Sequence, residues 1–445
     1  MNSSRIDGAG AASLSWGEAK SQRFGTLAFS GCAFGIVGVF AVGTFLGYTD
    51  VDVWGAFAVP MLLSAFTLPV LSRIQWLRDE RLFGLASIGL CAKFIGCYLR
   101  YLVEFFIYPG GDSILYHSGG ARIAQDFLDG NRDLSSLIPT GRGTEFILEV
   151  NGLVSLISGR SHLASSMIFS WLAYIGLLCF VSALRISFLN IRVRTYAAAL
   201  LLLPSLLFWT SAIGKDSWMI FGMGVFCLGA AKLMRGSPQG LTLATIGGYS
   251  TALVRPHITA LLLLGLVASL PGRWKGKGLV ATAMALAVVI FLAGVVSAVS
   301  ATLLPGFEGG VTEVLAQTAE RTMIGGSSVE VSAPNSLASY PAALISVLMR
   351  PFLFEASSLL ALLSAVESTG IAAWLAWRHR AFSELFRRFF DVAYVRFSLI
   401  FLLGFGFAWS AIGNLGILVR QRTQVLPFLL ILLAVAPAEN RHRDS

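Results

Sequence analysis

Long uncharged apolar runs dominate this sequence and constrain its fold more than any other feature. A helix needs about 20 apolar residues to cross a bilayer core about 30 Å thick. Runs of about that length lie at Phe24–Gly47, Val53–Leu71, Leu163–Leu184, Thr195–Gly214, Ser217–Ala231, Gly278–Leu304, Phe397–Val419 and Thr423–Ala438. Backbone polar groups cannot stay unpaired in lipid, so such runs must be helices. The sequence therefore predicts an all-α polytopic integral membrane protein.

Two further stretches, Leu82–Tyr108 and Phe352–Trp377, are long enough to span but carry charges. Hydrophobic residues make up 56% of the chain and charged residues 13%, against about 45–50% and about 25% in soluble domains. In the first stretch, Lys93, Arg100 and Glu104 follow one another at helical spacing. Because a charge in lipid costs at least ~2.5–3.5 kcal/mol, this stripe must face protein or water. Arg100 and Glu104 stand at the i,i+4 spacing that allows an ion pair.

The lysines and arginines predict the topology. With a cytoplasmic N-terminus, most of the 33 basic residues fall on the cytoplasmic side, as the positive-inside rule expects. This assignment requires Leu241–Leu270 to cross twice, with an external turn at Arg255-Pro256-His257. About twelve crossings result, and both termini lie in the cytoplasm. The net charge of +9 is thereby explained without nucleic acid.

The chain divides into a cytoplasmic segment (1–23), a single multi-span membrane domain (24–438) and a cytoplasmic tail (439–445). Residues 1–23 lack a signal-peptide layout, so Phe24–Gly47 is expected to be an uncleaved first span. The cysteines lie inside predicted spans and show no CxxC spacing, so neither disulfides nor a metal cluster is inferred.

Two external loops are expected, at about 108–162 and 305–340. The first contains two apolar helical patterns, one made of Ile114, Ala121, Ala124 and Leu128 and the other of Phe146, Ile147, Val150, Leu153, Val154 and Ile157. Glu145 and Glu149 lie on the opposite face of the second pattern. Amphipathic helices beside spans usually lie in the interface plane, so both are predicted to be interfacial. The second loop, rich in Gly, Ser and Ala, has no such pattern.

The polar motifs gather on the external side. They are Gly110–His117, Gly214–Ser217, Arg255-Pro256-His257, Arg350-Pro351, and Asn414 through Arg422. External arginines run against the charge bias and need another reason to be there. Anion binding supplies one, because the guanidinium fork matches phosphate oxygens. Snorkelling of each arginine to the interface is the structural alternative.

These motifs resemble those of the C-type membrane glycosyltransferases (GT-C). The shared pattern is a span ending in Gly110-Gly111-Asp112, a tyrosine four residues later at Tyr116, and two interfacial helices. The segment Pro204–Asp216 and the C-terminal Asn414-Leu415-Gly416…Arg420-Gln421-Arg422…Leu426-Pro427 resemble bacterial polysaccharide polymerases of the Wzy type, which make O-antigen and exopolysaccharide. The resemblance covers residues from Leu82 onward. More spans precede the acidic loop than in a simple GT-C protein, which leaves the boundary of the shared module open.

The resemblance implies inverting glycosyl transfer on the external face, from a polyprenyl phosphate or pyrophosphate donor to the hydroxyl of a glycan acceptor. An external carboxylate, Asp112 by preference, takes the proton of that hydroxyl; alternatively Asp112 is only a helix N-cap. Arg255, Arg420 and Arg422 stabilise the departing phosphate, with Lys215 and Arg350 as weaker candidates. Asp216, the second catalytic candidate, orients Lys215 or holds an acceptor hydroxyl. Tyr116, His117 and His257 complete the substrate-binding candidates.

No cofactor is expected; no ligand cluster demands a metal, and a divalent ion is left open. The expected partners are the polyprenyl-linked donor, the glycan acceptor, the bilayer and polysaccharide-assembly proteins, with no nucleic acid. The expected location is the bacterial inner membrane. The main alternative is a transporter or flippase of lipid-linked oligosaccharide, which predicts internal repeats with paired broken helices. A non-catalytic assembly partner is a third alternative.

Overall fold

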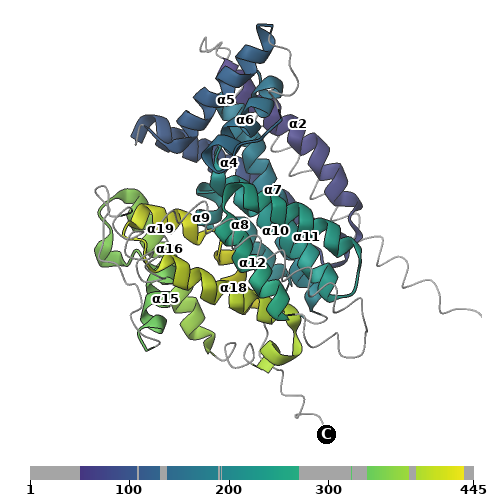
Figure 1. Cartoon of the computed structure of the whole chain (residues 1–445), viewed down its shortest axis with the longest axis vertical. Coiled ribbons are helices and arrows are strands. Elements are labelled where there is room, and N and C mark those ends of the chain that lie inside the picture. Colours follow the sequence, from purple (N-terminus) through teal and green to yellow (C-terminus); the bar gives the residue numbers. More distant parts are fainter. Residues whose placement is uncertain are drawn as a thin grey trace, which may run out of the picture. The chain divides into compact units, whose positions relative to one another are not determined.

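The computed structural model describes residues 51–107, 110–130, 138–188, 191, 193–269, 322, 338–379 and 387–434. These residues are helical, with no strand among them, as the apolar runs predict (Figure 1). The expected spans Phe24–Gly47 and Gly278–Leu304, the two termini and most of the loop at 305–340 lie outside the described residues.

Four described helices are long and apolar enough to cross a membrane. They are α2 (Val51–Arg73, with the candidate span at Asp52–Arg73), α7 (His162–Ser187), α10 (Lys215–Met234) and α16 (Leu359–Trp377). Shorter apolar helices are α8 (Val193–Leu202), α12 (Pro256–Ser269), α15 (Tyr340–Met349) and α18 (Ala393–Trp409). An all-helical membrane protein is therefore supported, while about twelve crossings remain an expectation.

The described chain divides into two compact units. The first consists of residues up to 139, 148–174 and 211–213, and the second of 140–147, 175–210 and residues from 214 onward. The sequence predicted one multi-span membrane domain.

The first unit contains α2, α3 (Gln75–Asp79), α4 (Phe83–Leu102), α5 (Asp112–Leu128), most of α6 (Thr144–Ser158) and the first half of α7. A π-helix, η1 (Val103–Ile107), continues directly from α4. Hydrogen bonds tie the helices together: Tyr174 Oη donates to Ala86 O (2.8 Å) and Trp171 Nε1 to Thr67 Oγ1 (2.8 Å). On α2, Leu62 and Phe66 are 69% and 63% exposed, as expected of a helix with one face on lipid.

The two helices predicted in the first external loop are present. They are α5 and α6, whose bounds enclose the two apolar patterns. Within the first unit, Asn151 Nδ2 on α6 donates to Tyr116 O on α5 (3.0 Å). Their position in the membrane interface remains an expectation.

The second unit contains the second half of α7 and the helices α8, α10, α12, α15, α16 and α18. It also contains α9 (Pro204–Phe208), α11 (Gln239–Val254), α19 (Leu415–Arg422), α20 (Leu426–Leu429) and α21 (Ile431–Ala434). The predicted break in Leu241–Leu270 is present: α11 ends at Val254, Arg255 is its C-cap, and α12 begins at Pro256. Proline is well suited to the first turn of a helix, where its missing N–H leaves no bond unmade. The break therefore follows directly from the sequence.

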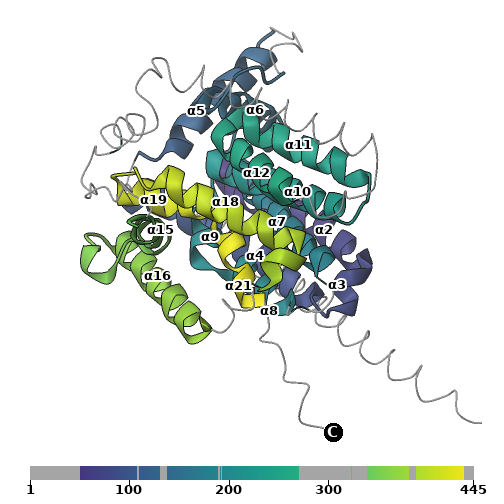
Figure 2. The ribbon, with the colours of Figure 1, turned by 60° about the horizontal axis from the view of Figure 1, so that its bottom comes forward.

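Helices α10 and α11 lie side by side (Figures 1 and 2), and glycines let their backbones approach closely. A methyl group built at Gly229 would overlap the backbone nitrogen of Ala244, and one at Gly247 would overlap that of Phe226. Small residues at the contact are the usual solution for helices that must pack in lipid. In the same unit, aromatic rings join α18 to α20, with the ring centroids of Phe401 and Phe428 4.2 Å apart.

Candidate functional site

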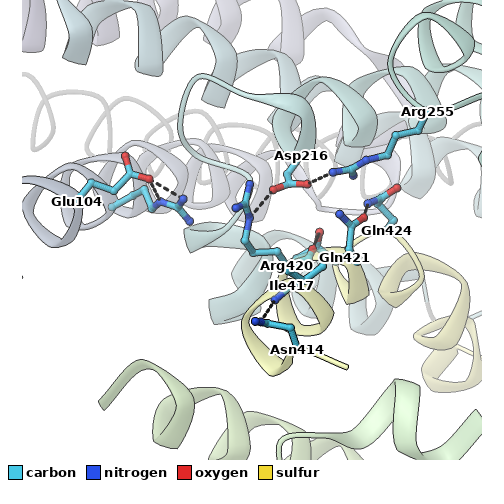
Figure 3. Close-up of polar contacts among 10 residues, drawn as sticks. Glu104, Asp216, Arg255, Asn414, Ile417, Arg420, Gln421 and Gln424 are labelled. Carbon is cyan, nitrogen blue, oxygen red and sulfur yellow. Dashed lines mark hydrogen bonds and ion pairs between the residues drawn. The ribbon is translucent and has the colours of Figure 1, made fainter. Parts of the chain in front are cut away.

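Asp216 is the centre of a buried polar cluster in the second unit (Figure 3). It stands in the first turn of α10, where the positive end of the helix dipole favours a carboxylate. Arg255 Nη2 donates to its Oδ1 at 3.0 Å, and Arg420 Nε donates to its Oδ2 at 3.0 Å. Both carboxylate oxygens are therefore engaged by arginines.

The two arginines come from segments far apart in the sequence. Arg255 occupies the break between α11 and α12, where the chain leaves helical geometry. Arg420 lies in the last turn of α19, a helix whose start is capped by the Asn414 side chain accepting from Ile417 N (3.1 Å). Of the three arginines expected to bind one phosphate, Arg255 and Arg420 thus meet at Asp216, and a shared phosphate site stays a prediction.

The cluster has a surplus of positive charge and an unmet donor. One carboxylate faces two guanidinium groups, and the Asp216 side chain is only 6% exposed. The Arg255 side chain is 10% exposed, and its Nη1 has no hydrogen-bond partner among the described residues. The Arg420 side chain is 29% exposed. A buried donor without an acceptor is costly, so this arrangement favours an additional anionic or polar oxygen.

The segment 140–147 packs against the residues that flank this cluster. Gly143 N donates to Leu253 O (2.8 Å), two residues before Arg255. The ring of Phe146 lies 5.2 Å from that of Trp218, two residues after Asp216. A methyl group built at Gly143 would lie 3.9 Å from Lys215 Nζ. Sequence analysis placed this segment in an external loop but not beside the arginines.

Arg422 does not join the Asp216 cluster. Its side chain is fully buried, with Nη2 3.6 Å from Glu367 Oε1. Its Nη1 donates to Ser368 Oγ and, at 3.2 Å, to Arg350 O. Residues two apart on a helix point to opposite sides, so Arg420 and Arg422 cannot both reach the Asp216 carboxylate from α19.

Two more of the predicted anion-binding residues have partners in the second unit. Arg350 contacts Glu355 through Nε (2.8 Å) and Nη2 (2.5 Å). The ring of His257, in the first turn of α12, lies 5.3 Å from that of Trp409. Glu355 and Glu367 were noted in the sequence only as charges within one predicted span, and their partners could not be read from it.

In the first unit, Asp112 is the first residue of α5 and is exposed. The N-cap is Gly111, in an extended conformation, so Asp112 does not hold the N-cap position considered for it. Tyr116 is buried. The His117 ring lies 4.9 Å from that of His162. Burial lowers the pKa of His117 below its usual range, against a smaller opposing effect of Asp52, so the ring is neutral at neutral pH and is a weaker partner for phosphate.

A second polar network lies near Asp112. Arg100 and Glu104 pair as their spacing predicts, with Nε to Oε1 at 2.7 Å (Figure 3). Ser113 Oγ donates to Glu104 Oε2, and His162 Nε2 lies 3.3 Å from Ser113 Oγ. Ser113 lies inside the Gly110–His117 motif, but the sequence assigned it no role, and His162 at the end of the loop lies in no motif.

Among the described residues, no group of three or more His, Cys, Asp or Glu side chains could hold a metal ion. Comparisons with protein-family models, curated proteins and solved structures found no match.

Proposed function

We propose that the chain is a membrane glycosyltransferase of the polysaccharide-polymerase kind, acting on a polyprenyl phosphate- or pyrophosphate-linked sugar at the external face. The observation that carries this proposal is the convergence of Arg255 and Arg420 on Asp216, with an unmet donor on Arg255. Paired guanidinium groups suit phosphate because their planar N–H forks match its oxygens.

The proposed reaction is a single displacement with inversion. The acceptor hydroxyl oxygen attacks the anomeric carbon, and the bond from that carbon to the phosphate oxygen breaks. Asp112 takes the hydroxyl proton as general base. The phosphate departs with the bonding electron pair, and Arg255 and Arg420 stabilise its growing negative charge.

Asp216 is assigned a different role from general base. Both of its oxygens already accept hydrogen bonds from arginines, so the carboxylate is occupied by those two side chains. It instead fixes the two guanidinium groups in one orientation, so that no reorganisation is needed when the phosphate charge develops. Arg422, paired with Glu367 inside the protein, serves packing in this scheme.

Conservative substitution of the arginine pair tests the proposal. Arg→Lys at 255 or 420 keeps the charge but removes the fork, so turnover should fall about as far as in Arg→Ala. Loss of a contact made mainly in the transition state costs ~2.7–4 kcal/mol, or roughly 10²–10³-fold in rate. The assay is transfer from a synthetic polyprenyl-diphosphate oligosaccharide by protein reconstituted in liposomes.

The matched control is Arg235→Lys. Arg235 also ends a helix of the second unit, but its Nε donates to Ile186 O (2.8 Å) and it has no assigned role in the reaction. Full turnover in both Lys variants would support the snorkelling alternative and contradict a phosphate site.

A transporter of lipid-linked oligosaccharide is the second candidate, and the helix break at Arg255-Pro256 is the observation that favours it, because transporter sites often use broken helices. The same liposomes distinguish the two functions. A glycosyltransferase releases polyprenyl phosphate and lengthens the glycan, whereas a transporter moves the intact donor across the bilayer and forms no new glycosidic bond.

A further inference from the structure

The strongest unassigned feature of the molecule is the buried network at the junction of α4, η1 and α5 in the first unit. It joins Arg100, Glu104, Ser113 and His162, all of which are at most 8% exposed. The carboxylate of Glu104 accepts from Arg100 on one oxygen and from Ser113 Oγ on the other. The network therefore connects the end of the charged helix α4 to the first turn of α5.

The backbone geometry of this junction is unusual. Glu104 lies in a π-helix, and single π-turns inserted at helix ends redirect side chains and occur often at functional sites. Here the wider turn begins at Val103, three residues after Arg100. The Arg100–Glu104 pair is nevertheless intact, with Nη2 to Oε1 at 2.6 Å.

The first turn of α5 fits closely against the same carboxylate. A Cβ built at Gly111 would lie 2.8 Å from Glu104 Oε1, so a larger residue here would push the end of the Glu104 side chain aside. Ser113, two residues later, donates its hydroxyl to Glu104 Oε2. Asp112 stands between these two contacts and is exposed. The Ser113 bond thus ties the first turn of α5 to Glu104 directly beside Asp112.

We propose that Glu104 and Ser113 are positioning residues that hold Asp112 in its working orientation. The inference rests on the proposed function, in which Asp112 is the general base. General-base catalysis requires the carboxylate to lie within hydrogen-bond reach of the proton that it takes, and a misplacement of 1 Å can lower the rate roughly 100-fold. A rigid first turn of α5 meets that requirement.

Ser113→Ala is the most informative variant. It removes the tie to Glu104 without leaving an unpaired buried charge, because Arg100 still neutralises Glu104. Glu104→Gln is less informative, because its side-chain amide can still hydrogen-bond to Ser113 while the negative charge beside Arg100 is lost. Ser118→Ala is the matched control, because Ser118 lies on the same helix, is exposed, and donates only to the nearby Leu115 O (3.0 Å).

Two measurements on the full-length protein test the proposal. Hydrogen exchange of the backbone amides in residues 110–116 should rise about 10-fold or more in Ser113→Ala and stay unchanged in Ser118→Ala. Turnover of the liposome assay should fall roughly 10-fold in kcat in Ser113→Ala, with KM for the donor within about 2-fold of the wild type, because donor binding does not depend on Asp112. A purely structural defect would instead lower the amount of folded protein at constant KM and kcat per active molecule.

The outcomes separate this proposal from the proposed function. If Asp112→Asn is inactive but Ser113→Ala exchanges or turns over like the wild type, positioning by this network is wrong and the general base stands. If Asp112→Asn keeps full activity, the assignment of Asp112 as base is wrong, and positioning of Asp112 for catalysis falls with it, whatever the exchange data show.

Discussion

In two places a buried carboxylate is held by hydrogen bonds from other side chains. Asp216 joins Arg255 and Arg420 in the second unit, and Glu104 joins Arg100 and Ser113 in the first. Removing one partner of a buried pair costs ~3–5 kcal/mol, mainly because an uncompensated charge remains. Variants at these positions therefore need a measure of folded protein beside any measure of activity.

Asp112→Asn is the sharpest residue-scale prediction. The substitution preserves size and removes only the interaction of the charge with the helix N-terminus, which contributes ~0.3–1 kcal/mol. The variant should reach wild-type abundance in the membrane but lose turnover, since an amide cannot take a proton. Activity per unit of membrane-inserted protein is the measurement. Full activity would contradict the assignment and direct attention to Glu145, which is exposed at the start of α6.

His117 gives a prediction on pH. Burial lowers its pKa in the folded protein, while the unfolded chain has the ordinary value of about 6.5. Below that value the unfolded state binds the proton more readily than the folded state. The stability that neutral His117 contributes is therefore fully present above about pH 6.5 and is lost as pH falls toward the folded-state pKa. His117→Asn should therefore show a smaller fall in Tm between pH 7.5 and pH 5 than the wild type. Equal falls in both proteins would contradict this account.

At the scale of elements, the closest packing is between α10 and α11. Gly229→Ala places a methyl group against the backbone nitrogen of Ala244, so the helices must separate. Overpacking of this kind costs typically ~1–3 kcal/mol. The expected result is a lower Tm in detergent and a smaller folded fraction.

Gly370→Ala is the control for this substitution. Gly370 is also inside a helix, α16, but a methyl group built there meets nothing within 4 Å. Replacing a helical glycine by alanine at an open position stabilises by roughly 0.5–1 kcal/mol, so its Tm should be unchanged or higher. A similar loss in both variants would mean that close α10–α11 packing is not the cause.

The elements also show how far sequence reasoning reaches. Local features were predictable: the helices α5 and α6 from their apolar spacing, the break at Arg255-Pro256 from proline, and the Arg100–Glu104 pair from i,i+4 spacing. Features that depend on tertiary contact were not. The pairing of Arg422 with Glu367 and the contact of Phe146 with Trp218 join residues more than fifty positions apart. No periodicity in one segment specifies such a partner.

At the scale of the whole molecule, contacts within the second unit agree with the charge-based topology. Arg235 at the end of α10 bonds the end of α7 through Ile186 O, and Arg396 Nη2 in α18 donates to Ser269 O at the end of α12 (3.0 Å). All four segment ends were assigned to the cytoplasm. Asp216, Arg255 and Arg420, assigned to the external side, likewise meet one another. Residues expected on one side of the membrane thus contact partners expected on the same side.

Reporter fusions test the topology directly. Fusions after Gly236, Lys275 and Glu384 should report the cytoplasm, because the basic residues around them favour that side. Fusions after Ser118, Gly309 and Gly416 should report the external side. The decisive position is Arg255: a cysteine placed beside it should be labelled by a membrane-impermeant reagent added from outside. Labelling only from inside would mean that α11 and α12 do not cross as a pair. Arg255 would then lie on the wrong side for an external phosphate, and its contact with Asp216 would be a cytoplasmic or purely structural ion pair.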